Sequence, residues 1–182
     1  FLDEEIQRLL EGGREREVPR SRRIYVNRNL KMDQIELVGF DMDYTLAIYD
    51  QEQMDRLTIE AALPKLIARG YPESLRTLDY ELTFPVRGLM VDAKLGNVLK
   101  MDRYKYVKRA YHGMRELSYD ERRELYHSMR IRAKGSTRFY FIDTLYALSE
   151  VTLFAAGVSH MEALGMTVDY HEWFYAIRDA VD

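Results

Sequence analysis

Two carboxylates stand two residues apart directly after a short apolar run. Asp41 and Asp43 follow residues 35–40, and Thr45 completes the pattern Asp-x-Asp-x-Thr. If the backbone leaves extended geometry here, both side chains can face one small site. One carboxylate can then attack phosphorus to form an aspartyl-phosphate, and the other can protonate the leaving alkoxide and later activate water. The pattern therefore indicates phosphoryl transfer.

This chemistry needs a divalent cation beside the two acids. An anionic nucleophile that approaches an anionic phosphate meets a Coulomb repulsion, which surroundings of low dielectric enlarge. The alternative is that the two acids simply begin a loop, because such pairs are common in turns. The apolar run before Asp41 and the apolar Leu46 after Thr45 favour the catalytic interpretation.

The apolar run is the element that would position the acids. Residues 35–40 have the length of a buried parallel strand, and Asp41 lies at its carboxyl end. Open α/β sheets bind ligands outside the carboxyl ends of their strands. Before this strand we expect a helix that ends before Gly12 and a charged linker over 14–23. After it we expect a helix over 53–69, interrupted or restarted at Pro64, and three strands within 84–110, one of them over 104–107. The last expected elements are a helix capped by Ser118 and Glu121 that runs to about Met129, a strand or helix start at 139–142, and helices over 149–164 and 169–182.

The composition limits the class of protein. The 182 residues are 47% hydrophobic and 31% charged, which is typical of one or two globular units with a core. With 27 Lys and Arg against 30 Asp and Glu, a net charge of -3 gives no general reason to expect nucleic acid or an anionic membrane as partner. Cysteine is absent, which excludes thiolate chemistry and fits a cytoplasmic protein. No apolar run approaches the ~20 residues that span a bilayer.

The acidic motif resembles the first motif of the haloacid dehalogenase superfamily. The resemblance implies that Asp41 is the nucleophile and Asp43 the general acid and base. It also implies that Mg²⁺ is bound by Asp41 and by the main-chain carbonyl of Asp43. The fold that it implies is α/β, with a Rossmann-like parallel sheet, only the first part of which is present, and an inserted α+β cap.

Further stretches resemble the cytosolic purine 5'-nucleotidases, the branch that prefers IMP and GMP. The resemblance implies Mg²⁺-dependent hydrolysis of purine nucleoside 5'-monophosphates. It covers nearly the whole chain in order and is more specific than Asp-x-Asp alone. The matching stretches are Ile24 to Met32, Gly39 to Ala47, Gly70 to Pro72, Thr83 to Leu89, Gly96 to Asp102, His112-Gly113, Arg138 to Tyr140 and Arg178 to Asp182.

The same resemblance assigns a purine-binding role to three residues. Arg178 and Asp182 match the pair that hydrogen-bonds the base, and residues four apart on a helix can present a donor fork and an acceptor together. Without the resemblance, an exposed ion pair between them is the simpler interpretation. Met114 stands where purine-selective members have an aromatic residue, so we expect weaker stacking on the base.

A complete enzyme of this superfamily needs a Ser or Thr and a Lys for the phosphate, and a later acidic motif. The resemblance puts these beyond Asp182, so we expect the chain to be a fragment that is inactive alone. Residues 1–50 are expected to form the N-terminal helix, linker and first core strand. Residues 51–182 are expected to form the cap region, β-rich over 84–110 and helical over 118–182, which continues past the chain end.

Two other functions stay open. A nucleotide-binding or scaffold protein of the same family without catalysis would explain Met114. An RNA-binding module would use the basic, tyrosine-rich residues 100–109, but a half-buried strand explains them better at this net charge. By resemblance, a nucleotide effector could bind near that segment, and a homo-oligomer is expected. The spacing of His127, His160 and His171 does not make a metal site.

Overall fold

The computed structural model describes residues 19–25, 27 and 31–182. The helix predicted before Gly12 and the start of the predicted linker lie outside the described residues. The contacts within the chain divide it into two units, Phe1–Leu46 and Ala47–Asp182, which are described separately. In the first unit, short 3₁₀ turns at Arg20–Arg22 and Met32–Gln34 are the helical segments of the described part.

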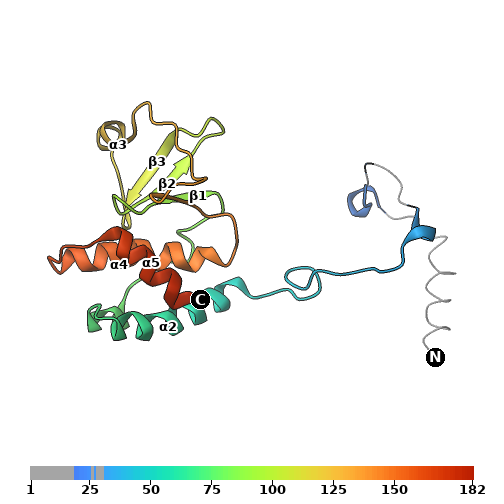
Figure 1. Ribbon diagram of the computed structural model, residues 1–182, viewed down its shortest axis with the longest axis horizontal. Helices are drawn as coiled ribbons and strands as arrows, with labels where there is room; N and C mark the ends of the chain where they lie inside the picture. Colours follow the sequence, from blue (N-terminus) through green and yellow to red (C-terminus); the bar gives the residue numbers. More distant parts are fainter. Residues whose placement is uncertain (1–18, 26, 28–30) are drawn as a thin grey trace. The chain divides into compact units, whose positions relative to one another are not determined.

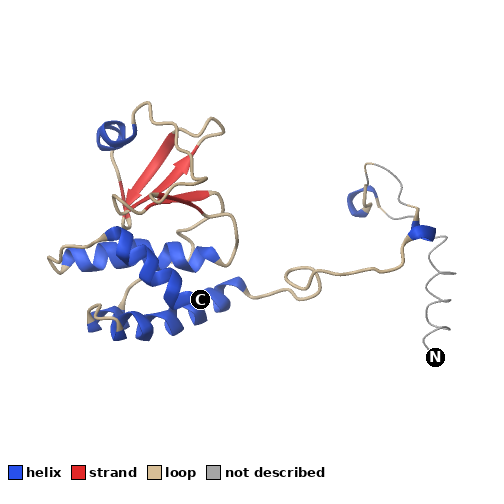
Figure 2. Ribbon diagram, viewed as in Figure 1, coloured by secondary structure: helices blue, strands red, loops and turns tan. Residues whose placement is uncertain are grey.

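The second unit is built on a five-stranded antiparallel sheet (Figures 1 and 2). Because each neighbouring pair runs antiparallel, Met90 lies opposite Leu99, and Leu99 lies opposite Ala110. The order in the sheet is β4-β3-β2-β1-β5. The strands are β1 (Leu89–Asp92), β2 (Asn97–Met101), β3 (Val107–His112), β4 (Arg115–Glu116) and β5 (Phe139–Phe141).

The helices form two layers on one side of this sheet. Helices α4 and α5 lie between the sheet and α2, while α3 lies on the other side (Figure 1). The second unit therefore has α3 on one face of the sheet, and the α4/α5 pair followed by α2 on the other face. The helices are α2 (Gln51–Ala68), α3 (Tyr119–Tyr126), α4 (Ala147–Ala163) and α5 (Tyr170–Val181), with a 3₁₀ helix at Glu73–Thr77. No helix among the described residues is both long and apolar enough to cross a membrane.

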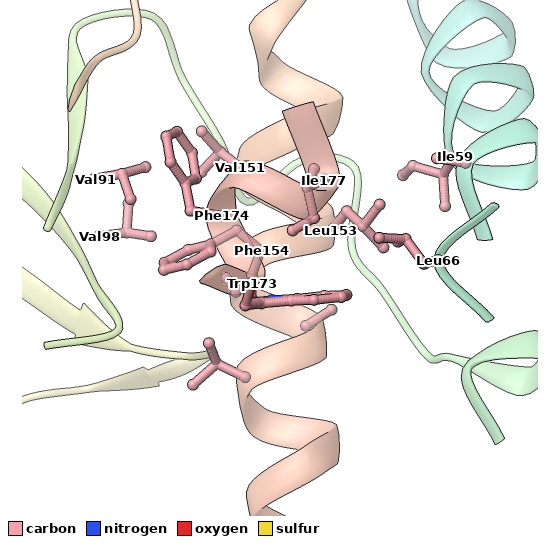
Figure 3. Close-up of a cluster of buried hydrophobic side chains, with 14 of the residues drawn as sticks. Ile59, Leu66, Val91, Val98, Val151, Leu153, Phe154, Trp173, Phe174 and Ile177 are labelled. Carbon is pink, nitrogen blue, oxygen red and sulfur yellow. The ribbon is translucent and has the colours of Figure 1, made fainter. Parts of the chain in front are cut away.

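The main core fills the space between these layers. Trp173 of α5 is fully buried, and its indole N–H donates to the Phe154 carbonyl of α4 at 3.2 Å. At Gly157, a Cβ would lie 2.2 Å from the Trp173 ring, so only glycine allows this approach of the two helices. Figure 3 shows Val91 and Val98 of the sheet on one side of this cluster and Ile59 and Leu66 of α2 on the other.

The sheet is buried on its second face as well. Successive residues of a strand point to opposite faces, so Val91 belongs to the main core while Met90 faces the other way. Met90 packs there with Leu99 and Ala110 of the sheet and with Tyr126 of α3. This second cluster attaches α3 to the sheet.

The prediction of a buried parallel strand over residues 35–40 is wrong. Residues 35–40 form no strand in the described part of the chain, and Leu37, Val38 and Phe40 are 88%, 57% and 70% exposed. A parallel strand needs parallel neighbours for its backbone hydrogen bonds. The described sheet has only antiparallel pairs, so the expected Rossmann-like parallel sheet is not supported and the chain is mixed α and β.

Two smaller predictions also need correction. Helix α2 continues through Pro64, because Leu63 and Leu66 are buried on either side of the proline and their packing outweighs one lost hydrogen bond. The strand predicted over 104–107 begins only at Val107. Asp102 accepts hydrogen bonds from the backbone N–H groups of Tyr104 and Tyr106, which form a turn before β3.

Other local predictions are confirmed. Ser118 and Glu121 form the expected capping box at the start of α3, although the helix ends at Tyr126 rather than near Met129. Residues 139–141 form a strand, which the periodicity alone left open. The last two predicted helices are α4 and α5, with ends within two residues of those expected.

Candidate functional site

The acidic motif of the first unit forms a tight turn. The Leu46 N–H donates to the Met42 carbonyl at 3.0 Å, and Tyr44 adopts a positive φ of 59°. The Thr45 hydroxyl donates to the Asp41 carboxylate at 3.3 Å. The backbone therefore turns within the motif, at residues 44–46. The threonine of the motif supports the carboxylate that would act as nucleophile.

The exposed carboxylates of Asp41 and Asp43 are accessible to a ligand. Carboxylate oxygens are the donors that Mg²⁺ prefers, and Mg²⁺ often takes only one or two of them together with water and substrate phosphate oxygens. Within the described residues, no group of three or more His, Asp or Glu side chains could hold a metal ion. The Asp41 carboxylate and the main-chain carbonyl of Asp43 match Mg²⁺ in donor type, and two such donors would leave the other positions to water and phosphate.

The second group of candidate residues lies at the end of α5. Asp169 caps this helix by accepting from the backbone N–H groups of His171 and Glu172. Trp173, Phe174, Ile177 and Ala180 are buried, so the other side of the helix carries Arg178 and Asp182 at the surface. The Asp182 N–H donates to the Arg178 carbonyl at 3.0 Å, which places the two residues one helical turn apart.

The ionic partner of Arg178 is a residue that the sequence analysis missed. The Arg178 Nε lies 3.6 Å from the Glu150 Oε2 in α4, and the Glu150 side chain is only 15% exposed. Burial raises the pKa of Glu150 above its ordinary value, the Arg178 charge opposes this rise, and the Asp182 charge adds to it. The simple ion pair between Arg178 and Asp182 is therefore replaced by a cluster of one cation and two acids. The sequence signal for Glu150 was an acid at the start of a mostly apolar run, residues 147–158.

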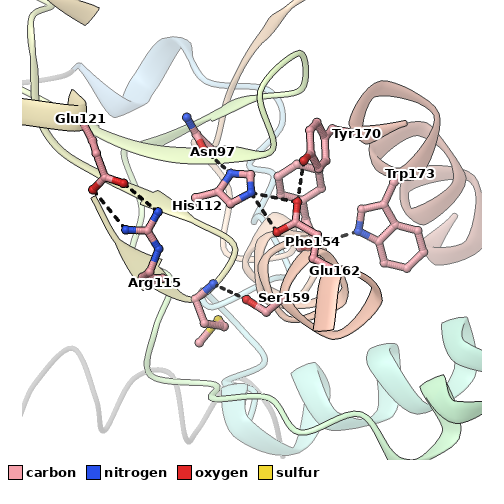
Figure 4. Close-up of polar contacts among 10 residues, drawn as sticks. Asn97, His112, Arg115, Glu121, Phe154, Ser159, Glu162, Tyr170 and Trp173 are labelled. Atoms are coloured by element: carbon pink, nitrogen blue, oxygen red, sulfur yellow. Dashed lines mark hydrogen bonds and ion pairs between the residues drawn. The ribbon is translucent and has the colours of Figure 1, made fainter. Parts of the chain in front are cut away.

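Met114 occupies the turn between β3 and β4. Its backbone N–H donates to the Ser159 Oγ of α4 at 2.8 Å (Figure 4). Gly113 has a φ of 54°, and a Cβ there would lie 2.3 Å from the same oxygen. Glycine is needed at this position both for the left-handed conformation and for the close approach to α4. The Met114 side chain is partly buried against the main core.

His112 connects this turn to the helices. Its Nδ1 lies 2.8 Å from the Asn97 Oδ1, and its Nε2 lies 2.9 Å from the Glu162 Oε1 (Figure 4). The Tyr170 hydroxyl donates to the same carboxylate at 2.5 Å, and burial together with Glu162 raises the pKa of Tyr170 to about 12. These bonds tie β2, β3, α4 and α5 together beside Gly113.

The candidate residues form separate groups. Arg178 lies beside Glu150 near the start of α4, whereas Met114 lies beside Ser159, nine residues further along the same helix. At 1.5 Å per residue, this separation is about 13 Å along the helix axis. Asp41 and Asp43 belong to the first unit, which is described by itself.

The basic, tyrosine-rich segment has ion pairs of its own. Arg109 makes two hydrogen bonds to Glu116, at 2.7 and 2.6 Å, and Lys108 lies 3.5 Å from Asp102. These acids neutralise part of the positive charge that a nucleic acid would use. The turn formed by Tyr104 and its neighbours also removes the period-two arrangement on which the strand interpretation of this segment rested.

A buried ion pair stabilises the sheet that carries these residues. Asp92 is fully buried and accepts two hydrogen bonds from Arg138, at 2.8 and 2.7 Å, and one from Tyr126 at 2.8 Å. Tyr126 in turn accepts a hydrogen bond from the Asn97 amide. The Asp92 carboxylate also accepts from the Lys94 backbone N–H at 3.2 Å, so its three partners are Arg138, Tyr126 and Lys94.

Removing the cation of this pair is expected to destabilise the second unit. Arg138→Ala should lower the free energy of unfolding by about 3–5 kcal/mol, because it leaves the Asp92 charge buried without its cation. Arg109→Ala is the control, since it removes an arginine from an exposed pair and should change stability little. Urea unfolding followed by circular dichroism measures both. Equal effects of the two substitutions would contradict the role given to Asp92.

Comparison with known proteins places these features in a family. The model of the 5' nucleotidase family matches residues 24–182. A 5'-nucleotidase domain-containing protein of Dictyostelium discoideum is 31% identical over 142 residues, which cover 76% of this chain and 24% of that protein. The 5'-nucleotidase domain-containing protein 2 of Rattus norvegicus is 30% identical over 170 residues, which cover 87% of this chain and 30% of that protein. The Homo sapiens protein of the same name is 28% identical over 169 residues, which cover 87% of this chain and 32% of that protein. The chain thus spans a quarter to a third of the length of these relatives.

Proposed function

The chain belongs to the 5'-nucleotidase family, and from this premise we propose that it supplies the nucleophile and the base site for Mg²⁺-dependent hydrolysis of purine nucleoside 5'-monophosphates. The observation that carries the proposal is the turn of the Asp-x-Asp-x-Thr motif, which holds the Asp41 carboxylate through Thr45 at an exposed position. Family membership supports nucleotide hydrolysis. The metal, the purine and the covalent intermediate are our inferences.

In the proposed reaction, the Asp41 carboxylate attacks phosphorus while the bond between phosphorus and the 5' oxygen breaks. Asp43 gives its proton to the leaving 5' alkoxide, which departs as the nucleoside. Asp43, now a carboxylate, takes a proton from water, and the resulting hydroxide attacks the aspartyl-phosphate. Inorganic phosphate leaves and Asp41 is regenerated. When bound by Asp41 and the Asp43 carbonyl, Mg²⁺ supplies positive charge that reduces the repulsion between the carboxylate and the phosphate.

The base site uses the end of α5. Arg178 offers a fork of donors, and Asp182 offers an acceptor one helical turn away. A purine with carbonyl and N–H groups on its six-membered ring presents the complementary acceptor and donor. Met114 is left out of this base site, because its contact with Ser159 lies about 13 Å along α4 from the contact of Arg178 with Glu150.

Chelation of divalent cations tests the metal requirement. In the intact protein that carries this chain, EDTA is expected to abolish release of phosphate from inosine 5'-monophosphate, and added Mg²⁺ to restore it. Colorimetric phosphate release measures the activity, and circular dichroism checks that the chelator leaves the fold unchanged. Full activity in EDTA would exclude the metal from the reaction. Nucleotide binding without hydrolysis, even with Mg²⁺, would instead favour the binding-protein alternative.

A further inference from the structure

Glu150 is an acid in an unusual place. It lies in the first turn of α4, a helix whose neighbouring residues Leu148 and Val151 are buried in or next to the main core. The Glu150 side chain itself is only 15% exposed. A mostly buried carboxylate is unfavourable unless a cation or hydrogen-bond donors accompany it. The cation that accompanies Glu150 is Arg178 of α5.

The contact uses one particular nitrogen of the guanidinium. Glu150 approaches the Arg178 Nε at 3.6 Å, and the Arg178 side chain stays 48% exposed. A guanidinium has five N–H donors in a rigid plane, four of them on its two terminal NH₂ groups. Because Nε is the nitrogen that faces Glu150 in this contact, Glu150 can act on the guanidinium through Nε and leave the two terminal NH₂ groups for a ligand.

We propose that Glu150 is a positioning residue of the base site, which holds the Arg178 guanidinium in the orientation that hydrogen-bonds a purine. This inference rests on the proposed function of Arg178. Glu150 does not contact the substrate; it acts through Arg178. Asp182, the other acid near Arg178, is assigned to the base itself.

The role differs from that of an ordinary ion pair. A pair that only stabilised the fold would affect all substrates alike, through the amount of folded protein. A positioning residue changes the affinity for substrates that use Arg178 and leaves the chemical step unchanged. The comparison between a purine nucleotide and a small phosphate ester without a base therefore separates the two roles.

The test is Glu150→Gln in the intact protein, which removes the charge and keeps the volume. KM for inosine 5'-monophosphate is expected to rise about tenfold, as for the loss of a charge-assisted interaction. The kcat for this substrate and the kcat/KM for p-nitrophenyl phosphate should not change. Glu172→Gln is the matched control, because Glu172 is an exposed glutamate of α5 and should leave KM unchanged.

A double-mutant cycle completes the experiment. If Glu150 acts through Arg178, Glu150→Gln should have no further effect on KM once Arg178→Ala is present. An unchanged KM in Glu150→Gln, or the same increase in both backgrounds, would overturn the inference while leaving the base site intact. If Arg178→Ala itself affected the nucleotide and the small ester equally, the proposed base site would be wrong, and the role of Glu150 would fall with it.

Discussion

Asp41→Asn is expected to lower kcat for nucleotide hydrolysis by about 10⁴-fold or more in the intact protein. The substitution removes the charge that attacks phosphorus, and an amide oxygen is a poor nucleophile. The fold should be unaffected, since Asp41 is exposed and the asparagine oxygen can still accept the Thr45 hydroxyl. Steady-state phosphate release with Mg²⁺ present measures the loss.

The control for this substitution is Asp33→Asn. Asp33 is an exposed aspartate of the same unit, in the 3₁₀ turn Met32–Gln34, and its loss removes the same charge without touching the motif. We expect the activity of this variant to equal that of the unchanged protein. If Asp41→Asn kept substantial activity, the assignment of the nucleophile would be wrong. If the unchanged protein can be trapped in a phosphorylated form and the Asp41→Asn variant cannot, the result would support the covalent step directly.

Arg178→Ala is expected to impair the hydrolysis of a nucleotide much more than the hydrolysis of a small phosphate ester. The kcat/KM for inosine 5'-monophosphate should fall about 10- to 100-fold, the equivalent of losing hydrogen bonds made by a charged group. The value for p-nitrophenyl phosphate should stay within about twofold, because a substrate without a base does not use this contact. The ratio of the two kcat/KM values is the measured quantity.

A second arginine, which contacts α5, provides the control for Arg178. Arg69 forms an exposed ion pair with Asp179, the residue next to Arg178. Arg69→Ala therefore removes the same side chain close to α5 but outside the proposed base site, and should leave the ratio unchanged. Arg178→Ala also leaves Glu150 without its cation, so thermal unfolding should be recorded for each variant. Equal losses for the two substrates would mean that Arg178 supports the fold and does not bind the base.

The sequence by itself determined the features that depend on near neighbours. The capping box of Ser118 and Glu121 lies within one helical turn, so its partners are visible from spacing alone. Strands β1 and β2 were readable as short apolar runs on either side of the Gly96 turn. The turn after Asp41 was likewise readable, because it follows from a short polar stretch that ends an apolar run.

Tertiary structure decided the features that depend on distant partners. An apolar run such as 35–40 becomes a strand only when another strand pairs with its backbone. The hydrophobic periodicity of the run does not show whether such a partner strand exists. Pro64 stays within α2 because packing against other elements compensates for one missing hydrogen bond. The pairing of Arg178 with Glu150 joins two helices. Its physical cause is the burial of Glu150, which arises only when α4 packs against its neighbours and a carboxylate inside the protein requires a cation.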